Sequence, residues 1–325
     1  MRAPRHDASA VNVDTEAARE YKAAMLLLSR RSFLATVSSA ILARESNAQA
    51  ETREEIIDIH QHTNYAGRTD EELITHQRKI GVTRTILLPA GRLFGLDAQC
   101  GTNVTVEALA KRLPGEFSFF ANEVPFLTEA AAEIEFYLRK GGIGIGEQKF
   151  TVESDSRAVQ LLAEIAQEFG VPVLLHFQFG RYNTSYARFA TTLQKFPKVN
   201  FIGHAQTFWA NIDAKCDQVT LYPKGPVTAG GLTDRYLQEH PNFFADLSAG
   251  SALNALRRDE AHAREFIARH ENKLLFGTDC DDKAGEGEKC SGAQMLATIR
   301  AWAPSKAVER KILFDNARAL LKLKA

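Results

Sequence analysis

Eight short runs rich in apolar residues alternate with segments of helix-like spacing from residue 55 onward, and this rhythm constrains the fold more than any other feature. The runs that we expect to be strands are 55–62, 83–89, 117–124, 143–150, 171–177, 200–205, 243–248 and 273–279. The segments that we expect to be helices are 70–80, 104–113, 129–139, 156–169, 186–196, 262–270, 293–302 and 305–322. Such alternation predicts a parallel sheet. Eight strand–helix units in about 270 residues predict an α/β fold of the closed (β/α)8 type, the TIM barrel.

An open doubly wound sheet is the alternative, but it would place a glycine-rich phosphate turn after the first strand. The first strand leads instead into the sequence His-Gln-His-Thr-Asn at residues 60–64. Three longer connections, 91–102, 206–228 and 280–289, follow the carboxyl ends of expected strands two, six and eight. Barrel enzymes build their sites from the connections on that face, so we expect the functional site there.

The first fifty residues have the features of an export signal. Residues 29–34, Ser-Arg-Arg-Ser-Phe-Leu, resemble a twin-arginine signal; an apolar run at 33–43 and a small-x-small cleavage pattern at 48–50 follow. We expect a disordered extension or mis-assigned start at 1–24, a signal peptide at 25–50 and the barrel at 51–325. The apolar run is too short for a stable membrane anchor, which needs about 20 residues. The prediction is a periplasmic or secreted protein whose leader binds the twin-arginine export machinery.

The net charge limits the kinds of partner that the sequence predicts, and the cysteine spacing limits the kinds of disulfide or metal site. Lys plus Arg and Asp plus Glu number 40 each, so the zero net charge gives no support to binding of nucleic acid or of an acidic membrane surface. The cysteines Cys100, Cys216, Cys280 and Cys290 show neither CxxC pairing nor zinc-ribbon spacing. They therefore do not predict a disulfide scaffold or a thiolate metal site. The sequence leaves the oligomeric state open, and a homo-oligomer is among the alternatives.

Histidines and one aspartate recur at the carboxyl ends of the expected strands. His60 and His62 end the first strand, and residues two apart on a strand share a face. His176 ends the fifth strand, His204 the sixth and Asp279 the eighth. A barrel would bring these side chains together at one mouth. Neutral imidazoles with a carboxylate suit Zn²⁺, and also Mn²⁺, Fe²⁺ or Co²⁺, so the sequence predicts a divalent metal site.

The remaining histidines fall outside the strand ends, and we expect them to be structural or surface residues. They are His6, His76, His240, His262 and His270.

The set of metal-site positions resembles that of the amidohydrolase superfamily. Residues 312–321, Ile-Leu-Phe-Asp-Asn-Ala-Arg-Ala-Leu-Leu, resemble the C-terminal signature of its amidohydrolase-related (family 2) branch, and the likeness runs from about residue 57 to residue 323. The resemblance implies that His60, His62 and His176 bind a metal whose water is activated near neutral pH. It also implies that Asp279 is both ligand and general base, and that His204 binds a second ion or hydrogen-bonds the reacting oxygens.

The fourth expected strand decides how many ions the site holds. Gly146-Glu147 on this strand resembles the Gly-Glu of TatD-like hydrolases in the same superfamily, where the Glu is a metal ligand. Glu147 is therefore a candidate ligand, with the alternative that it pairs with Lys149 or supports a neighbouring ligand. One ion is expected if Glu147 stays out of the ligand set, and two are expected if it bridges.

Cations and one aromatic residue near the same face are the candidates for binding a small-molecule substrate. Lys149, Arg92 and Arg181 could receive a carboxylate, and Trp209 could form a wall of the pocket. The predicted activity is hydrolysis of a C–O or C–N bond in a lactone, amide or ester of a small carboxylated molecule. The resemblance leaves a metal-dependent decarboxylase of the same branch as the alternative. The neutral charge disfavours a phosphoesterase acting on nucleic acid, and the intact ligand set disfavours a non-catalytic barrel.

Overall fold

The computed structural model describes residues 54–91 and 100–324. The expected extension and signal peptide lie outside the described residues, as does Arg92. Among the described helices, none combines the length and the apolar character that crossing a membrane requires.

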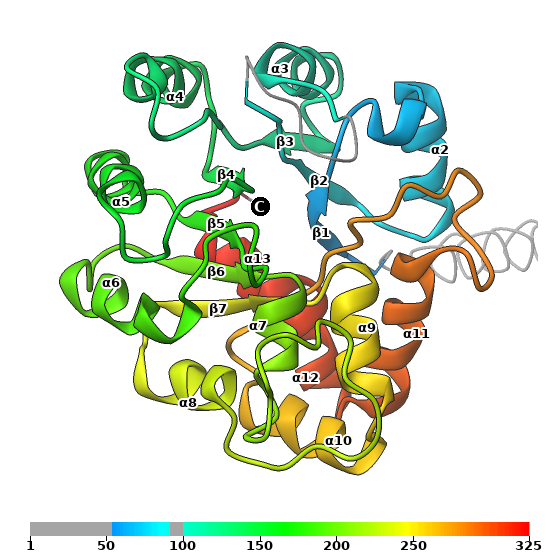
Figure 1. Ribbon diagram of the computed structural model, residues 1–325. Coiled ribbons are helices and arrows are strands. Elements are labelled where there is room, and N and C mark those ends of the chain that lie inside the picture. Colours follow the sequence, from blue (N-terminus) through cyan, green and yellow to red (C-terminus); the bar gives the residue numbers. More distant parts are fainter. Residues whose placement is uncertain (1–53, 92–99, 325) are drawn as a thin grey trace, which may run out of the picture. The chain divides into compact units, whose positions relative to one another are not determined.

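Eight parallel strands surround the centre of the barrel (Figure 1). They are β1 Ile57–Gln61, β2 Arg84–Leu87, β3 Phe117–Phe119, β4 Ile145–Gln148, β5 Val173–His176, β6 Phe201–His204, β7 Phe243–Asp246 and β8 Leu274–Leu275. Strands β1–β3 and β4–β8 form two arcs. A bridge between Ala121 and Ile145 joins β3 to β4, and Ile59 N donates to Phe276 O at 3.0 Å between β1 and β8. The predicted TIM barrel is confirmed, and each strand lies within an expected run.

Helices alternate with the strands and form the outer layer (Figure 1). The helices between strands are α2 Asp70–Lys79, α3 Asn103–Arg112, α4 Ala130–Arg139, α5 Arg157–Phe169, α6 Phe189–Lys195, α7 Gln206–Ala210, α8 Leu232–Glu239, α9 Ala249–Arg257 and α10 Glu260–Arg269. Those after β8 are α11 Ser291–Trp302, α12 Lys306–Arg310, a π-helical turn η3 Lys311–Asp315 and α13 Asn316–Leu320. Short 3-10 turns occur at η1 Tyr65–Gly67 and η2 Tyr186–Arg188. The sequence did not predict α7, α8 or α9.

Local capping explains where two of these helices begin and end. Thr69 precedes α2, and its hydroxyl accepts from Glu72 N at 3.2 Å while Glu72 Oε2 accepts from Thr69 N at 2.9 Å. This reciprocal pair satisfies two donors that a helix N-terminus otherwise leaves unpaired. Ser156 caps α5 in the same position, and Gly170 ends it at φ 65°, a left-handed conformation that glycine adopts without a steric penalty.

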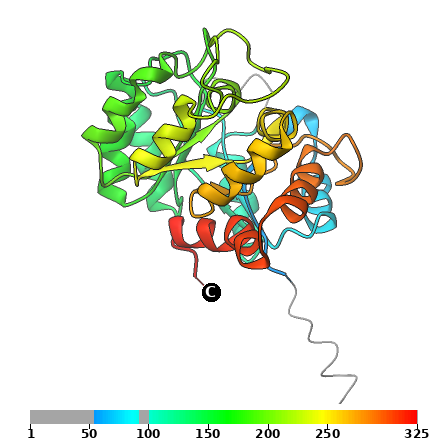
Figure 2. The same ribbon diagram turned by 90° about the horizontal axis from the view of Figure 1, so that it is seen from below.

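Apolar side chains fill the barrel interior at its amino end. Ile57, Ile59, Leu174 and Ile202 contribute to one buried cluster, together with Phe314, Ala317, Leu320 and Leu321 from the C-terminal helices. Figure 2 shows these last helices, in red, gathered on one side of the barrel. Because they close the amino end of the barrel, polar side chains can collect only at the carboxyl end of the strands.

A candidate metal centre at the carboxyl end of the barrel

A β-bulge at the end of β1 directs two histidines into the mouth of the barrel. Asp58 pairs with Thr85 and Gln61 with Leu87, so three steps along β1 correspond to two along β2. The extra residue changes the alternation of faces. Asp58 consequently faces outward, where its carboxylate accepts from Gln77 Nε2 of α2 at 2.7 Å. Strand β4 has a similar irregularity between Ile145 and Gln148, the segment that carries Glu147.

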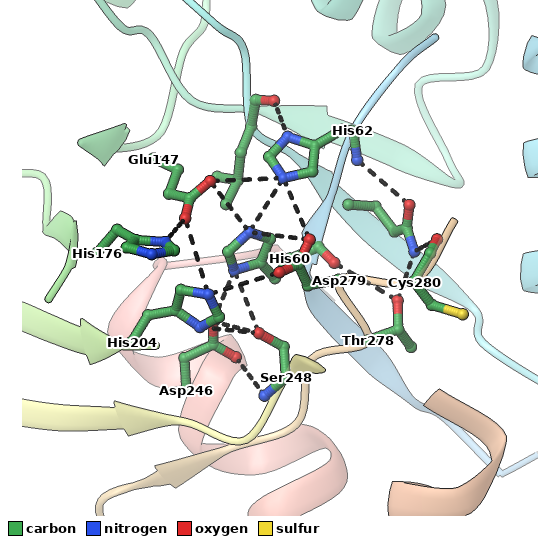
Figure 3. A network of polar contacts seen from close by, with 12 residues as sticks. His60, His62, Glu147, His176, His204, Asp246, Ser248, Thr278, Asp279 and Cys280 are labelled. Atoms are coloured by element: carbon green, nitrogen blue, oxygen red, sulfur yellow. Dashed lines mark hydrogen bonds and ion pairs between the residues drawn. The ribbon is translucent and has the colours of Figure 1, made fainter. Parts of the chain in front are cut away.

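The structure brings six of the expected side chains together, as Figure 3 shows. They lie in or shortly after five strands and are His60, His62, Glu147, His176, His204 and Asp279. The four histidines and Glu147 are buried, and the Asp279 side chain is 12% exposed. More than 200 residues separate the first member from the last, so the barrel alone creates this cluster.

Four donor atoms lie near one another, and five of the six distances between them are close to those of a tetrahedral metal site. His60 Nε2 lies 3.2 Å from His62 Nε2, and Glu147 Oε2 lies 3.7 and 3.6 Å from these two nitrogens. Asp279 Oδ1 lies 3.8 and 3.4 Å from the same nitrogens. A tetrahedral ion with bonds of about 2.1 Å separates its donors by about 3.4 Å, which is within the range of these distances.

Asp279 Oδ1 gives a further test of fit. This oxygen is buried and accepts no hydrogen bond from any described residue. A buried carboxylate oxygen without a partner is unfavourable unless a cation binds it. The buried cluster of His, Glu and Asp is therefore consistent with a divalent metal site.

Hydrogen bonds behind the histidines orient their lone pairs towards the centre. His62 Nδ1 donates to the Leu88 carbonyl at 2.7 Å, and His60 Nδ1 lies 2.7 Å from Asp246 Oδ2. In both rings the proton therefore belongs on Nδ1, and Nε2 is available to a metal. His204 Nδ1 contacts the same Asp246 oxygen at 3.0 Å and Ser248 Oγ at 3.0 Å, which leaves its Nε2 facing the cluster.

Glu147 connects two groups of ligands. Its Oε2 faces His60 and His62, whereas its Oε1 lies 2.5 Å from His176 Nδ1 and 3.7 Å from His204 Nε2. The contact of His176 Nδ1 with Glu147 is a short hydrogen bond, and His176 Nε2 lies 3.3 Å from the Gln178 side-chain oxygen. The two oxygens of Glu147 therefore face different imidazoles.

The carboxylates of the cluster are held in their ionised form. Burial opposes ionisation of Asp246, but His60 and His204 lower its pKa to about 2. Burial also opposes ionisation of Glu147, yet His176 and Lys149 hold its pKa well below the usual value. The pKa of Asp279 is likewise well below its usual range, because the effects of His60 and His204 outweigh burial. The three carboxylates are therefore ionised, which is the form in which a carboxylate binds a cation.

Of the residues expected to bind substrate, Lys149 and Arg181 lie beside the cluster, whereas Trp209 is buried. Lys149 Nζ and the Arg181 guanidinium lie 5.8 and 5.0 Å from the centre of the Tyr182 ring, and that ring packs edge-on against His176 at 5.5 Å. The structure thus places both cations beside the cluster. Trp209 does not lie on a pocket wall. It is 1% exposed, its indole donates to the Asp246 carbonyl at 3.0 Å, and its ring packs against Phe266 of α10.

Two polar residues of the site were missed from the sequence. Asp246 ends β7, the same place on its strand as His176 and His204 on theirs, and this position was a usable signal. Tyr65 lies in η1, and its ring packs edge-on against His62 at 5.0 Å. The Asp279 carboxylate and burial together raise the pKa of Tyr65, so it stays a neutral hydroxyl. The pattern of strand ends does not indicate Tyr65 as a site residue, because Tyr65 lies in the turn η1.

A pocket of about 490 Å³ lies beside the cluster, between the connections that follow β5 and β6. Gln178, Phe179, Asn183 and Thr207 are among its lining residues. Gln178 also contacts His176 Nε2, so the pocket and the ligand set share one side chain.

Comparison with solved structures identifies similar barrels. An uncharacterised TIM-barrel protein from Bordetella bronchiseptica is 16% identical over 82% of this chain and 98% of its own, with a TM-score of 0.58. A candidate 2-pyrone-4,6-dicarboxylic acid hydrolase from Pseudomonas putida is 18% identical, with coverages of 83% and 98% and a TM-score of 0.57. The 2,6-dihydroxybenzoate decarboxylase from Rhizobium is 15% identical, with coverages of 84% and 100% and a TM-score of 0.55. At these identities the likeness shows the fold.

No curated protein matches the chain significantly. A family model does, and it is described as amidohydrolase and covers residues 57–323, which include all six side chains of the cluster. The chain therefore belongs to the amidohydrolase family (family 2), as its strand-end histidines and C-terminal signature implied.

Proposed function

We propose that this protein is a metal-dependent hydrolase that cleaves a C–O or C–N bond, as in a lactone, amide or ester, of a small carboxylated substrate. The observation that carries the proposal is the buried four-donor set, with an unpaired Asp279 oxygen, at the carboxyl end of a barrel. Thiolates are absent from that set, and imidazole with carboxylate suits Zn²⁺.

When bound, a divalent ion supplies Lewis acidity and lowers the pKa of a water towards neutrality. The side chains of the site would transfer the protons and bind the substrate. Asp279 would accept a proton, since its carboxylate is ionised and its Oδ1 accepts no hydrogen bond from a described residue. His204 would donate from Nε2 to the developing oxyanion in its protonated form, which the charge of Asp246 favours. Lys149 and Arg181 lie where they would attract a substrate carboxylate.

A decarboxylase is the second candidate, because similar barrels include 2,6-dihydroxybenzoate decarboxylase and the 5-carboxyvanillate decarboxylase of Sphingomonas paucimobilis. The two activities differ in their products. Incubation of the metal-loaded protein with lactones, and separately with carboxylated phenols, distinguishes them. Ring opening with uptake of water supports the hydrolase, and release of CO₂ supports the decarboxylase.

Substitution of the proposed base tests the assignment of roles. Asp279→Asn keeps the size of the side chain and removes its basicity, so we expect turnover to fall about 10²–10⁴-fold while the melting temperature and much of the metal are retained. Asp315→Asn, on the opposite side of the barrel, is the matched control and should leave turnover unchanged. Wild-type turnover in Asp279→Asn would show that Asp279 is not the base.

The number of ions depends on Glu147. Because its two oxygens face different imidazoles, we expect Glu147→Ala to lose at least one equivalent of metal per chain. Elemental analysis of protein dialysed against dilute Zn²⁺ measures the content. Equal metal content in Glu147→Ala and wild type would place Glu147 outside the ligand set.

A further inference from the structure

A second group of metal-binding residue types lies outside the candidate metal centre. His76 of α2, Cys280 after β8 and Cys290 at the start of α11 are all buried, and their donor atoms lie within 4.8 Å of one another. The two sulfur atoms are 3.8 Å apart, and His76 Nε2 lies 3.3 Å from Cys290 Sγ. Sequence spacing could not indicate this group, since nine residues separate the cysteines and the histidine comes from a distant helix.

The lone pair of His76 faces the two sulfurs. Its Nδ1 lies 2.9 Å from Gln77 Oε1. The Gln77 amide nitrogen donates to Asp58 Oδ2 at 2.7 Å and to Thr85 Oγ1 at 2.8 Å, and these contacts fix the orientation of the amide. Because Gln77 Oε1 can only accept, His76 Nδ1 carries a proton, and in the neutral ring Nε2 is the lone-pair atom. A buried carboxylate thus orients the ring through one amide, in the manner of the outer partners of metal-bound histidines.

The spacing of the donors fits a thiophilic ion. Two thiolates at about 2.3 Å from a tetrahedral Zn²⁺ are about 3.8 Å apart, which equals the separation of the two sulfurs in the structure. Two thiolates also neutralise a divalent charge, and a neutral imidazole supplies the third ligand. We propose that His76, Cys280 and Cys290 bind a thiophilic cation of the Zn²⁺ class at a structural site separate from the barrel mouth.

Such an ion would link the segment 280–290 to α2. This segment begins directly after Asp279, so its position affects a residue of the candidate metal centre. Exposed ion pairs already join the same parts, Lys283 to Glu72 at 2.9 Å and Lys79 to Glu286 at 3.4 Å. Exposed pairs of this kind stabilise little, because water screens them. The cation would therefore add a buried link between this segment and α2.

Cobalt substitution of the full-length protein tests the site, because thiolate ligation of Co²⁺ gives a charge-transfer absorption in the near ultraviolet that oxygen and nitrogen ligands do not give. The protein is reduced, stripped of metal without oxygen and titrated with Co²⁺. We expect the absorption in wild type and its loss in Cys290→Ser. Zinc content should fall by one equivalent per chain in the same variant.

Two matched variants serve as controls. Cys216→Ser changes a half-exposed cysteine elsewhere, and Cys100→Ser changes the cysteine that influences the charge on His62, so it reports on thiolate ligation at the barrel mouth. Both should keep the absorption. His76→Gln retains the two cysteines and should shift or weaken it, which keeps the test informative if Cys290→Ser does not fold.

The proposal is overturned if wild type lacks the absorption, or if Cys100→Ser abolishes it and Cys290→Ser does not. It is also overturned if thiol counting shows that Cys280 and Cys290 form a disulfide in the isolated protein and Zn²⁺ does not bind after reduction. These outcomes are independent of the proposed hydrolase, because the absorption and the zinc equivalent are measured without substrate.

Discussion

Asp246 illustrates how one buried carboxylate can serve two ligands. Its Oδ2 lies 2.7 Å from His60 Nδ1 and 3.0 Å from His204 Nδ1, while Ser248 Oγ donates to the same oxygen at 2.7 Å. A negative charge at this point raises the basicity of both rings and holds their Nε2 atoms towards the centre. Asp246 would therefore orient two ligands of a bound ion from behind the histidines.

Removing that charge should weaken metal binding more than it weakens the fold. Asp246→Asn preserves the shape of the side chain, and we expect metal affinity to fall about 10–100-fold. Competition with a chromophoric chelator measures the affinity, and Asp315→Asn provides a control at the other end of the barrel. An unchanged dissociation constant would mean that His60 and His204 are oriented without help from Asp246.

Residue positions at the site could be predicted only as far as regular strand geometry holds. His176, His204 and Asp279 each end an apolar run, so the barrel rule locates them. Regular alternation would place Asp58 on the same face as His60, but the bulge in β1 turns it outward to Gln77. The bulge arises from the pairing of β1 with β2, so the sequence of β1 alone does not indicate it.

At the scale of elements, the strands were predictable and three helices were not. The apolar runs have the length of strands and are bounded by polar residues, and all eight formed as expected. The segment 206–228 was expected to be a connection, yet Gln206–Ala210 forms α7 and buries Phe208 and Trp209. A helix of five residues contains little more than one turn. The spacing of its apolar residues therefore does not show, without the surrounding core, which side of the helix is buried. This explains the incorrect position expected for Trp209.

Helices α8 and α10 are joined by a buried charged contact whose effect depends on pH. Asp234 Oδ1 accepts from His270 Nε2 at 2.6 Å and from Arg269 Nε at 3.1 Å. Burial opposes ionisation of Asp234, but the hydrogen bond from His270 and the charge of Arg269 lower its pKa. A carboxyl group whose pKa is lower in the folded state stabilises the fold above its unfolded pKa of about 3.9, and this stabilisation is lost as the pH falls further.

We therefore expect Asp234→Asn to reduce the free energy of unfolding by about 1.5–3 kcal/mol at pH 7, and by progressively less below pH 4. Thermal unfolding of both proteins at pH 7 and pH 3 measures the difference. Asp70→Asn, which removes a surface pair with Arg112 at 3.2 Å, should cost at most about 1 kcal/mol at either pH. A deficit of equal size at pH 7 and pH 3 would contradict the account.

In the barrel as a whole, the apolar residues that stabilise the fold lie at the amino end, and the residues of the candidate metal centre lie at the carboxyl end. The amino end is filled by Ile57, Ile59 and their neighbours together with the C-terminal helices, whereas the carboxyl end holds the buried polar cluster. Polar groups at the carboxyl end weaken the core there, and the apolar closure at the amino end offsets the loss. Substitutions at the amino end should therefore change the melting temperature and leave the rate of reaction unchanged.

Phe314 provides the strictest test of this separation. It comes from the turn η3 and packs, 7% exposed, into the interior cluster, so Phe314→Ala should remove about 3–5 kcal/mol of unfolding free energy through lost burial and a cavity. Phe136→Ala removes a ring that is 51% exposed and should cost much less. At a temperature where both variants are folded, we expect their kcat to equal that of wild type. A fall in kcat for Phe314→Ala, measured with full metal content and an intact fold, would show that the C-terminal helices position the catalytic side chains as well as closing the barrel.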